Sequence, residues 1–234
     1  MLRTDPARLV LEYTRLMMGF LLFQPAPARI AMIGLGGGSL AKYCALKLPD
    51  ADFTAIEISP RVIAMRDAFG IPRDGPRFRV LRADGAEYVR RDGEPLDVLL
   101  VDGFDGGGQP DQLRSAAFYD YCRDRLATDG VLVVNLHADE AAADGTIDRI
   151  RDAFAGRIVV IEADDCQNEV VFAATDASFP PTFGKLVERL RALEASHPVG
   201  LDVTVRKILQ YGEPRHAVPR RRRRSKRNEL ADRR

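Results

Sequence analysis

A glycine cluster between two apolar runs constrains this 234-residue chain more than any other feature. Residues 30–33 are apolar and lead into Gly34-Leu35-Gly36-Gly37-Gly38, and a helix-compatible stretch separates that cluster from a second apolar run that ends on Glu57. This pattern is typical of a strand, a tight turn, a helix and a second strand, with a nucleoside bound at the carboxyl edge of a parallel sheet. We therefore expect Gly34, Gly36 and Gly38 to shape a ligand loop, and Glu57 to accept the two ribose hydroxyls.

Two further acids end apolar runs later in the chain. Asp84 follows residues 78–81 and precedes Gly85, and Asp102 follows residues 96–101. We expect Asp84 with Gly85 to meet the adenine amino group. Three strand-end carboxylates suit a cationic sulfonium nucleoside, because they would repel a pyrophosphate. The dinucleotide pattern also requires a third glycine where this chain has Ser39, which disfavours a nicotinamide nucleotide.

The alternation of apolar runs and helical patterns predicts an α/β fold. Strands are expected over 30–34, 52–57, 77–82, 96–102, 130–136, 157–163 and 168–175, and helices over 39–48, 60–69, 84–91, 114–127, 141–154 and 182–196. The connection between the last two strands is too short for a helix, so they should form an antiparallel hairpin. The expectation is a Rossmann-like, seven-stranded, mostly parallel sheet with a C-terminal antiparallel strand and helices on both faces, which resembles the class I methyltransferases.

Composition divides the chain into three parts. Residues 1–28 should hold an N-terminal helix over 6–23 and a linker, residues 29–209 the nucleoside-binding α/β domain, and residues 210–234 a disordered basic tail. The tail has ten Lys/Arg against two Asp/Glu from residue 215 onward, while the whole chain has a net charge of +1. Phosphate neutralisation by this tail would permit nucleic-acid contact, but no aromatic residues are interleaved, and we favour a solvated terminus.

The sequence also predicts a location. No apolar run is long enough to span a bilayer, and no signal-peptide pattern precedes the first helix. Three widely spaced cysteines fit reduced thiols and indicate neither a disulfide framework nor a metal site. We expect a cytoplasmic protein without membrane association or bound metal.

The segment after the fourth expected strand has the composition of a site with a lid. Asp102 and Asp105 lie three residues apart and are followed by three glycines, residues 106–108. Carboxylates at the end of a central strand, followed by a mobile loop, favour an active site that closes over its ligand. The alternative is a strand-end acid that caps a turn, with glycines that only give the loop its reach.

At this point the chain resembles a known family, the spermidine synthases or polyamine aminopropyltransferases. The similarity extends from about Tyr13 to about Asn135, and more loosely to Thr175. The residues that carry it are Tyr13, 25–27, 33–34 with the glycines, 57–60, 84–85, 101–105 and, most specifically, the run Leu113-Arg114-Ser115-Ala116-Ala117-Phe118-Tyr119-Asp120-Tyr121-Cys122.

The resemblance implies roles for the candidate residues. An amine such as putrescine would attack the methylene next to the sulfonium of decarboxylated S-adenosylmethionine. Asp102 would act as general base, and Asp105 would hold the ammonium groups of the substrate. Tyr119 would support the pocket wall, although a packing role explains a buried tyrosine equally well. The family is also compatible with a homodimer.

Several positions depart from the family pattern. The loop acid of the family is Gly37 here, its last loop glycine is Ser39, the proline after its catalytic strand is Gly106, and the histidine beside its tyrosine is Thr14. The N-terminal β-domain of the family is also missing from this sequence. Two alternatives therefore stay open: a methyltransferase that uses S-adenosylmethionine on a small molecule, and a non-catalytic nucleoside-binding protein that retains only the fold.

Overall fold

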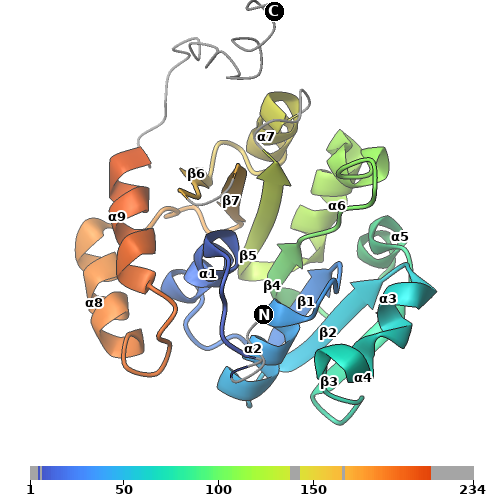
Figure 1. Ribbon diagram of the computed structural model, residues 1–234. Coiled ribbons are helices and arrows are strands. Elements are labelled where there is room, and N and C mark those ends of the chain that lie inside the picture. The colour runs from blue at the N-terminus through green and yellow to red at the C-terminus, as the bar shows by residue number, and fades with distance from the viewer. Residues whose placement is uncertain (1–4, 6, 138–142, 165–166, 212–234) are drawn as a thin grey trace, which may run out of the picture.

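The computed structural model describes residue 5 and residues 7–137, 143–164 and 167–211, and its centre is one twisted sheet of seven strands (Figure 1). The strand order is β3-β2-β1-β4-β5-β7-β6. β7 pairs antiparallel with both β5 and β6, whereas every other neighbouring pair is parallel. The strands are β1 Arg29–Ile33, β2 Asp52–Glu57, β3 Phe78–Arg82, β4 Leu96–Val101, β5 Leu126–His137, β6 Ile158–Glu162 and β7 Asn168–Ala174. The predicted fold class and the terminal hairpin are confirmed.

Helices cover both faces of the sheet (Figure 1). The first face carries α1 Glu12–Met17, the 3₁₀ helix η1 Met18–Leu22, α2 Ser39–Lys47, α3 Pro60–Ala64, α4 Arg66–Phe69, α8 Phe183–Leu193 and α9 Leu201–Tyr211, and the second carries α5 Gly85–Arg90, α6 Ala116–Arg125 and α7 Ala143–Ala153. A further 3₁₀ turn, η2, spans Asp111–Arg114. The inner strands β1, β4 and β7 are buried on both sides, which explains why their sequences are largely apolar, whereas the edge strand β3 alternates buried and exposed residues.

The strand order reverses between β1 and β4, and this reversal locates the ligand edge. From β1 the chain moves outward to β2 and β3, then returns to place β4 on the other side of β1. Ile33 at the end of β1 is in register with Ile56 of β2 and Val101 of β4. The residues that follow these three positions, Gly34, Glu57 and Asp102, therefore lie together at the carboxyl edge, where open α/β sheets bind ligands.

The N-terminal helix is shorter than the predicted range 6–23. Leu11 has extended backbone dihedrals and α1 begins only at Glu12. The Arg15 guanidinium donates hydrogen bonds to the carbonyls of Leu9 and Val10, which holds the preceding backbone in a non-helical path. After Met17 the helix tightens into η1, where Gly19 packs closely against Phe172 and Thr204.

The C-terminal part of the domain contains a helix that was not predicted. α9 has its own apolar face, with Leu201, Val205 and Ile208 buried in the first core cluster. The helix expected over 60–69 is divided at Met65 into α3 and α4. The expected start of α7 at 141 and the tail from 212 lie outside the described residues, so the predicted domain limits stay predictions. Among the helices that the structure describes, none is long and apolar enough to cross a membrane.

Phe172 offers a test of the first core cluster. Its side chain is fully buried on β7, and its ring centroid lies 5.2 Å from that of Phe23. Phe172→Ala should lower the free energy of unfolding by about 3–5 kcal/mol, because it removes buried apolar contacts and leaves a cavity in the core. Phe183→Ala, at a position that is 60% exposed, should change it by less than about 0.5 kcal/mol in the same denaturant titration. Equal losses would contradict this packing.

Candidate functional site

The glycine turn after β1 fits tightly between neighbouring segments. Gly34 has a φ of 92°, and a Cβ added there would lie 2.3 Å from the carbonyl oxygen of Asp102. Gly38 has a φ of 69°, and a Cβ there would lie 2.4 Å from Cγ1 of Ile71. Gly36 also has a positive φ, but it faces open space. Two of the three candidate glycines are thus required by close packing as well as by backbone conformation.

Glu57 connects the glycine turn to the end of β2. Its Oε2 accepts a hydrogen bond of 2.9 Å from the backbone N–H of Leu35, and its Oε1 accepts one of 2.7 Å from the N–H of Ser59. The side chain is buried, yet each oxygen keeps a second lone pair for a hydroxyl donor. The next residue, Ile58, is 60% exposed and places an apolar surface beside this carboxylate.

Asp84 caps α5, a role that the sequence analysis did not include. Its Oδ1 accepts hydrogen bonds of 2.7 and 3.3 Å from the backbone N–H groups of Ala86 and Glu87, and its Oδ2 accepts one of 2.8 Å from the Gln112 side chain. A Cβ added at Gly85 would lie 2.4 Å from Cγ2 of Ile33, so Gly85 allows α5 to approach β1. The contact of Asp84 and Gly85 with an adenine stays a prediction.

Asp102 lies at the centre of a hydrogen-bonded cluster. Its backbone N–H donates to the carbonyl of Ile33 at 2.9 Å. Its Oδ1 accepts a 2.8 Å bond from Nδ2 of Asn135, and its carboxylate accepts a further bond from the Tyr13 hydroxyl. Asn168 donates a 2.7 Å bond to Oδ1 of Asn135, which fixes the orientation of that amide. Four segments, α1, β5, β7 and the end of β4, thus meet at one carboxylate.

The protonation of Asp102 reflects two opposing influences. Burial raises the pKa of this carboxyl, and the bonds from Asn135 and Tyr13 and the nearby charge of His137 lower it; the net direction is upward. The His137 ring also packs edge-on against Phe104, with 5.0 Å between the ring centroids. A carboxyl with a raised pKa and fixed donors has the properties of a proton acceptor in a catalytic site.

The other two candidate residues lie in different surroundings. Asp105 is exposed, and its Oδ1 accepts a 2.7 Å bond from the N–H of Gly107, so it stabilises the turn of its own loop. Tyr119 is fully buried in the second core cluster, edge-on to Phe118, and its hydroxyl has no hydrogen-bond partner among the described residues. Both positions are typical of structural residues, and their predicted contacts with substrate stay predictions.

Sequence reasoning assigned no site role to Tyr13, Asn135, Asn168 or Ile58. Asn135 and Asn168 are polar residues at the edge of otherwise apolar strands, and that interruption is the signal that could have identified them. Tyr13 lies before the first strand and Asp102 follows the fourth, so no local sequence pattern indicates that the two side chains meet.

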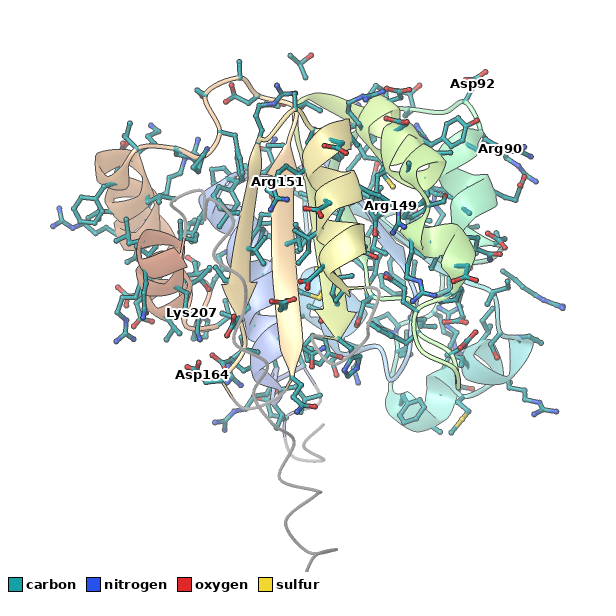
Figure 2. The ribbon with its side chains drawn as sticks, turned by 90° about the horizontal axis from the view of Figure 1, so that it is seen from above. Arg90, Asp92, Arg149, Arg151, Asp164 and Lys207 are labelled. Atoms are coloured by element: carbon teal, nitrogen blue, oxygen red, sulfur yellow. The ribbon has the colours of Figure 1, made fainter. Side chains whose placement is uncertain are left out.

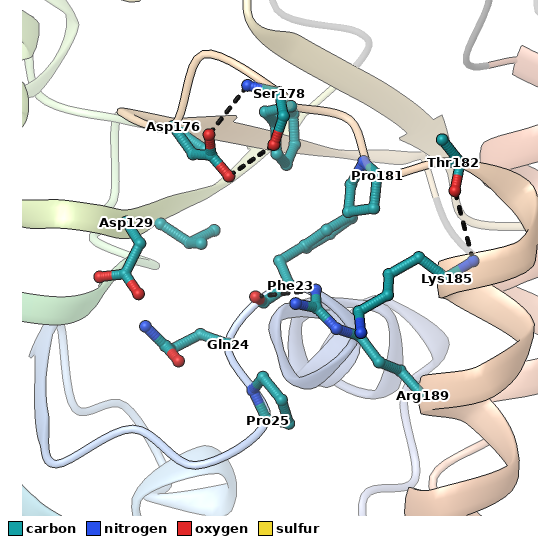
Figure 3. A pocket seen from close by; sticks show the side chains of 13 residues that line it. Phe23, Gln24, Pro25, Asp129, Asp176, Ser178, Pro181, Thr182, Lys185 and Arg189 are labelled. Carbon is teal, nitrogen blue, oxygen red and sulfur yellow. Dashed lines mark hydrogen bonds between the residues drawn. The ribbon is translucent and has the colours of Figure 1, made fainter.

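A separate pocket lies at the opposite, amino edge of the sheet (Figure 3). It is formed where β5 begins and β7 ends, next to α8 and the segment after η1. Two of its charged groups are engaged locally: Asp176 accepts from Ser178, and Arg189 donates to the carbonyls of Leu22 and Phe23. The pocket therefore does not share residues with the cluster around Asp102.

Comparisons with known proteins agree with the fold and identify the family. Residues 11–141 match the spermine/spermidine synthase domain, and the chain belongs to this family. The polyamine aminopropyltransferase of Neisseria meningitidis serogroup A is 40% identical over 199 residues, which cover 84% of this chain and 75% of that protein. This establishes the resemblance that the sequence analysis predicted.

Two solved structures share the fold at low sequence identity. Human methyltransferase-like protein 13 in complex with SAH superposes with a TM-score of 0.68 at 22% identity, covering 80% of this chain and 89% of that one. A probable spermidine synthase from Corynebacterium glutamicum gives a TM-score of 0.66 at 22% identity, covering 80% and 73%. The fold is therefore shared by a methyltransferase-like protein and a probable spermidine synthase, and it does not distinguish methyl transfer from aminopropyl transfer.

Gly34→Ala tests the close packing of the glycine turn. The new methyl group would overlap the Asp102 carbonyl, and we expect a loss of about 1–3 kcal/mol in the free energy of unfolding together with weaker binding of an adenosyl ligand. Gly36→Ala is the control for stability, because Gly36 also has a positive φ but no heavy atom of the described residues lies within 4 Å of an added Cβ. Thermal unfolding and calorimetry would measure the two effects, and identical stabilities of the two variants would refute the overlap.

Proposed function

We propose that this chain is an aminopropyltransferase that transfers the aminopropyl group of decarboxylated S-adenosylmethionine to a small amine such as putrescine. The observation that carries the proposal is the cluster around Asp102. The carboxyl group has a raised pKa and donors from Tyr13 and Asn135, and the backbone of the same residue packs directly against Gly34 of the nucleoside loop. Family membership and the relative that shares 40% identity support the same activity.

The nucleoside would be held along the carboxyl ends of β1, β2 and β3. Glu57 would accept the ribose hydroxyls through the lone pairs that Leu35 and Ser59 leave open. The exposed side chain of Ile58 would contact the base, and Asp84 would accept its amino group. Gly36 faces open space, so the ligand could approach the backbone of the loop at this position.

Asp102 would then provide the proton acceptor for the reaction. An alkylammonium has a pKa of about 10.4 and no free lone pair at neutral pH, so the amine must lose a proton before it attacks. The deprotonated nitrogen forms a bond to the methylene carbon next to the sulfonium, the carbon–sulfur bond breaks, and the sulfur leaves as a neutral thioether. Tyr13 and Asn135 would hold the carboxylate toward the amine and stabilise its charged form.

Asp102→Asn tests the general-base role. Turnover of the aminopropyl donor with putrescine should fall by about 10²- to 10⁴-fold, because the amide cannot accept the proton, while the affinity for the donor stays the same. In the unmodified chain the rate should fall as the pH drops through the raised pKa of Asp102, since only the carboxylate form is active.

A control lies at the other end of the same strand. Asp97 accepts hydrogen bonds from the backbone N–H groups of Ala28 and Arg29 at the amino edge. Asp97→Asn retains an acceptor oxygen and should leave the turnover unchanged. Full turnover in the Asp102→Asn variant would eliminate Asp102 as the base.

A second candidate function is methyl transfer from S-adenosylmethionine to a small molecule, and one observation favours it. At the position of the family's loop acid, Gly37 faces open space, with no heavy atom within 4 Å of an added Cβ. That space is compatible with the carboxylate of an intact S-adenosylmethionine, which an acidic residue would repel.

Gly37→Asp tests which donor the loop accepts. The position has no positive φ and no steric neighbour, so the substitution should be tolerated. The new carboxylate should increase the preference for the decarboxylated donor over S-adenosylmethionine by about tenfold, through one charge-assisted contact with its ammonium group. Calorimetric titration with both donors gives this ratio; an unchanged ratio would show that residue 37 does not face the donor's side chain.

A further inference from the structure

A buried ion pair connects α1 to α9 near the candidate site. Nζ of Lys207 lies 3.5 Å from Oε1 of Glu12, and the two side chains are only 8% and 10% exposed. Lys207 also contacts the Asp164 carboxylate at 2.8 Å and donates to the Glu162 carbonyl at 2.7 Å. Figure 2 shows Lys207 and Asp164 together at the end of β6.

Glu12 receives a second attachment from the same segment. The backbone N–H of Asp164 donates to Oε2 of Glu12 at 2.5 Å. Burial alone would lower the pKa of Lys207, but the carboxylates of Asp164 and Glu12 outweigh that influence and raise it. The lysine is therefore charged, and removing it would take an opposite charge away from the buried Glu12 carboxylate.

The helix that carries Glu12 depends on such attachments. α1 has six residues, and its N-cap residue Leu11 makes no side-chain cap bond. A helix this short is not stable by itself and takes its position from tertiary contacts. The residue after Glu12 is Tyr13, whose hydroxyl is bonded to Asp102. A displacement of α1 at Glu12 would consequently also displace Tyr13, whose hydroxyl is bonded to the proposed catalytic carboxylate.

We propose that Lys207 is a positioning residue for the reaction: its ion pair with Glu12 fixes α1 so that the Tyr13 hydroxyl stays bonded to Asp102. This inference rests on the proposed function, since it assigns Lys207 an effect on the base of that reaction. Lys207 contacts Glu12, Asp164 and the Glu162 carbonyl, so its influence on Asp102 passes through Glu12 and Tyr13.

Lys207→Met tests the proposal, with Lys185→Met as the matched control. Lys185 forms an exposed ion pair with Glu188 on α8, so its loss should have no effect on catalysis. In the Lys207→Met variant kcat/KM should fall about tenfold to a hundredfold, as expected for a displaced site group. The acidic limb of its pH–rate profile should also move to higher pH, because Asp102 loses a bond that stabilises the carboxylate.

The pH readout needs one precaution. The side chains that act on Asp102 are Tyr13 of α1 and Asn135 and His137 of β5, and the charge of His137 lowers the pKa of this carboxyl. Repeating the profiles in a His137→Gln background removes that charge and leaves Tyr13 and Asn135 as the side chains that act on Asp102. A lower melting temperature with an unshifted acidic limb would overturn the proposal, because Lys207 would then contribute to stability alone.

A second measurement does not depend on turnover. In protein labelled with [¹³C]tyrosine, the Cζ resonance of Tyr13, assigned with Tyr13→Phe, should follow the titration of Asp102 in the unmodified chain and in Lys185→Met, but not in Lys207→Met. If the unmodified chain transfers no aminopropyl group, the proposed function fails while this measurement still decides the positioning role.

A double variant covers the case in which Lys207→Met does not fold. Glu12→Gln with Lys207→Met leaves no unpaired buried charge and keeps an acceptor for the Asp164 N–H. This protein should fold and still lose the coupling between Tyr13 and Asp102. Coupling as strong as in the unmodified chain would overturn the proposal.

Discussion

The contact between Gly34 and the Asp102 carbonyl is the constraint on which the site depends. It occurs where the strand order reverses, so the ends of β1 and β4 meet directly. A side chain at Gly34 would separate them, as the 2.3 Å distance to an added Cβ shows. Because the two ends are joined, the ligand loop after β1 and the carboxylate after β4 form one surface.

Contacts from both faces and from the sheet itself hold this surface in place. On the first face, α1 brings Tyr13 to Asp102, and on the sheet itself Asn135 and Asn168 orient the other side of the carboxylate. On the second face, Gly85 lets α5 pack against Ile33 under the turn. Catalytic groups fixed by neighbours of this kind need less reorganisation when charge develops.

Much of the fold was predictable because its signals are local. Continuous apolar runs gave the strand positions to within a few residues, and the short link before β7 indicated the antiparallel hairpin. α9 was missed because it follows the helix-breaking residues Pro198 and Gly200. α1 was predicted too long because the bonds from Arg15 to upstream carbonyls are not visible in the sequence. Glu57, Asp102 and the glycines were found as strand-end residues, whereas the bond from Tyr13 to Asp102 depends on tertiary structure alone.

One departure from the family pattern, Gly37, bears directly on the choice of donor. The loop that would meet the nucleoside keeps its glycines and Glu57, while the position that would meet the donor's side chain is Gly37. The proposal is therefore best supported for the ribose contact of Glu57 and for Asp102 as the general base. Which donor the protein uses is the central question.

Product analysis answers that question most directly. The purified chain would be incubated with putrescine and, in separate reactions, with decarboxylated S-adenosylmethionine or S-adenosylmethionine, and the products identified by mass spectrometry. The account predicts spermidine and methylthioadenosine from the decarboxylated donor only. A methylated amine and S-adenosylhomocysteine from the intact donor, or no product from either, would contradict it.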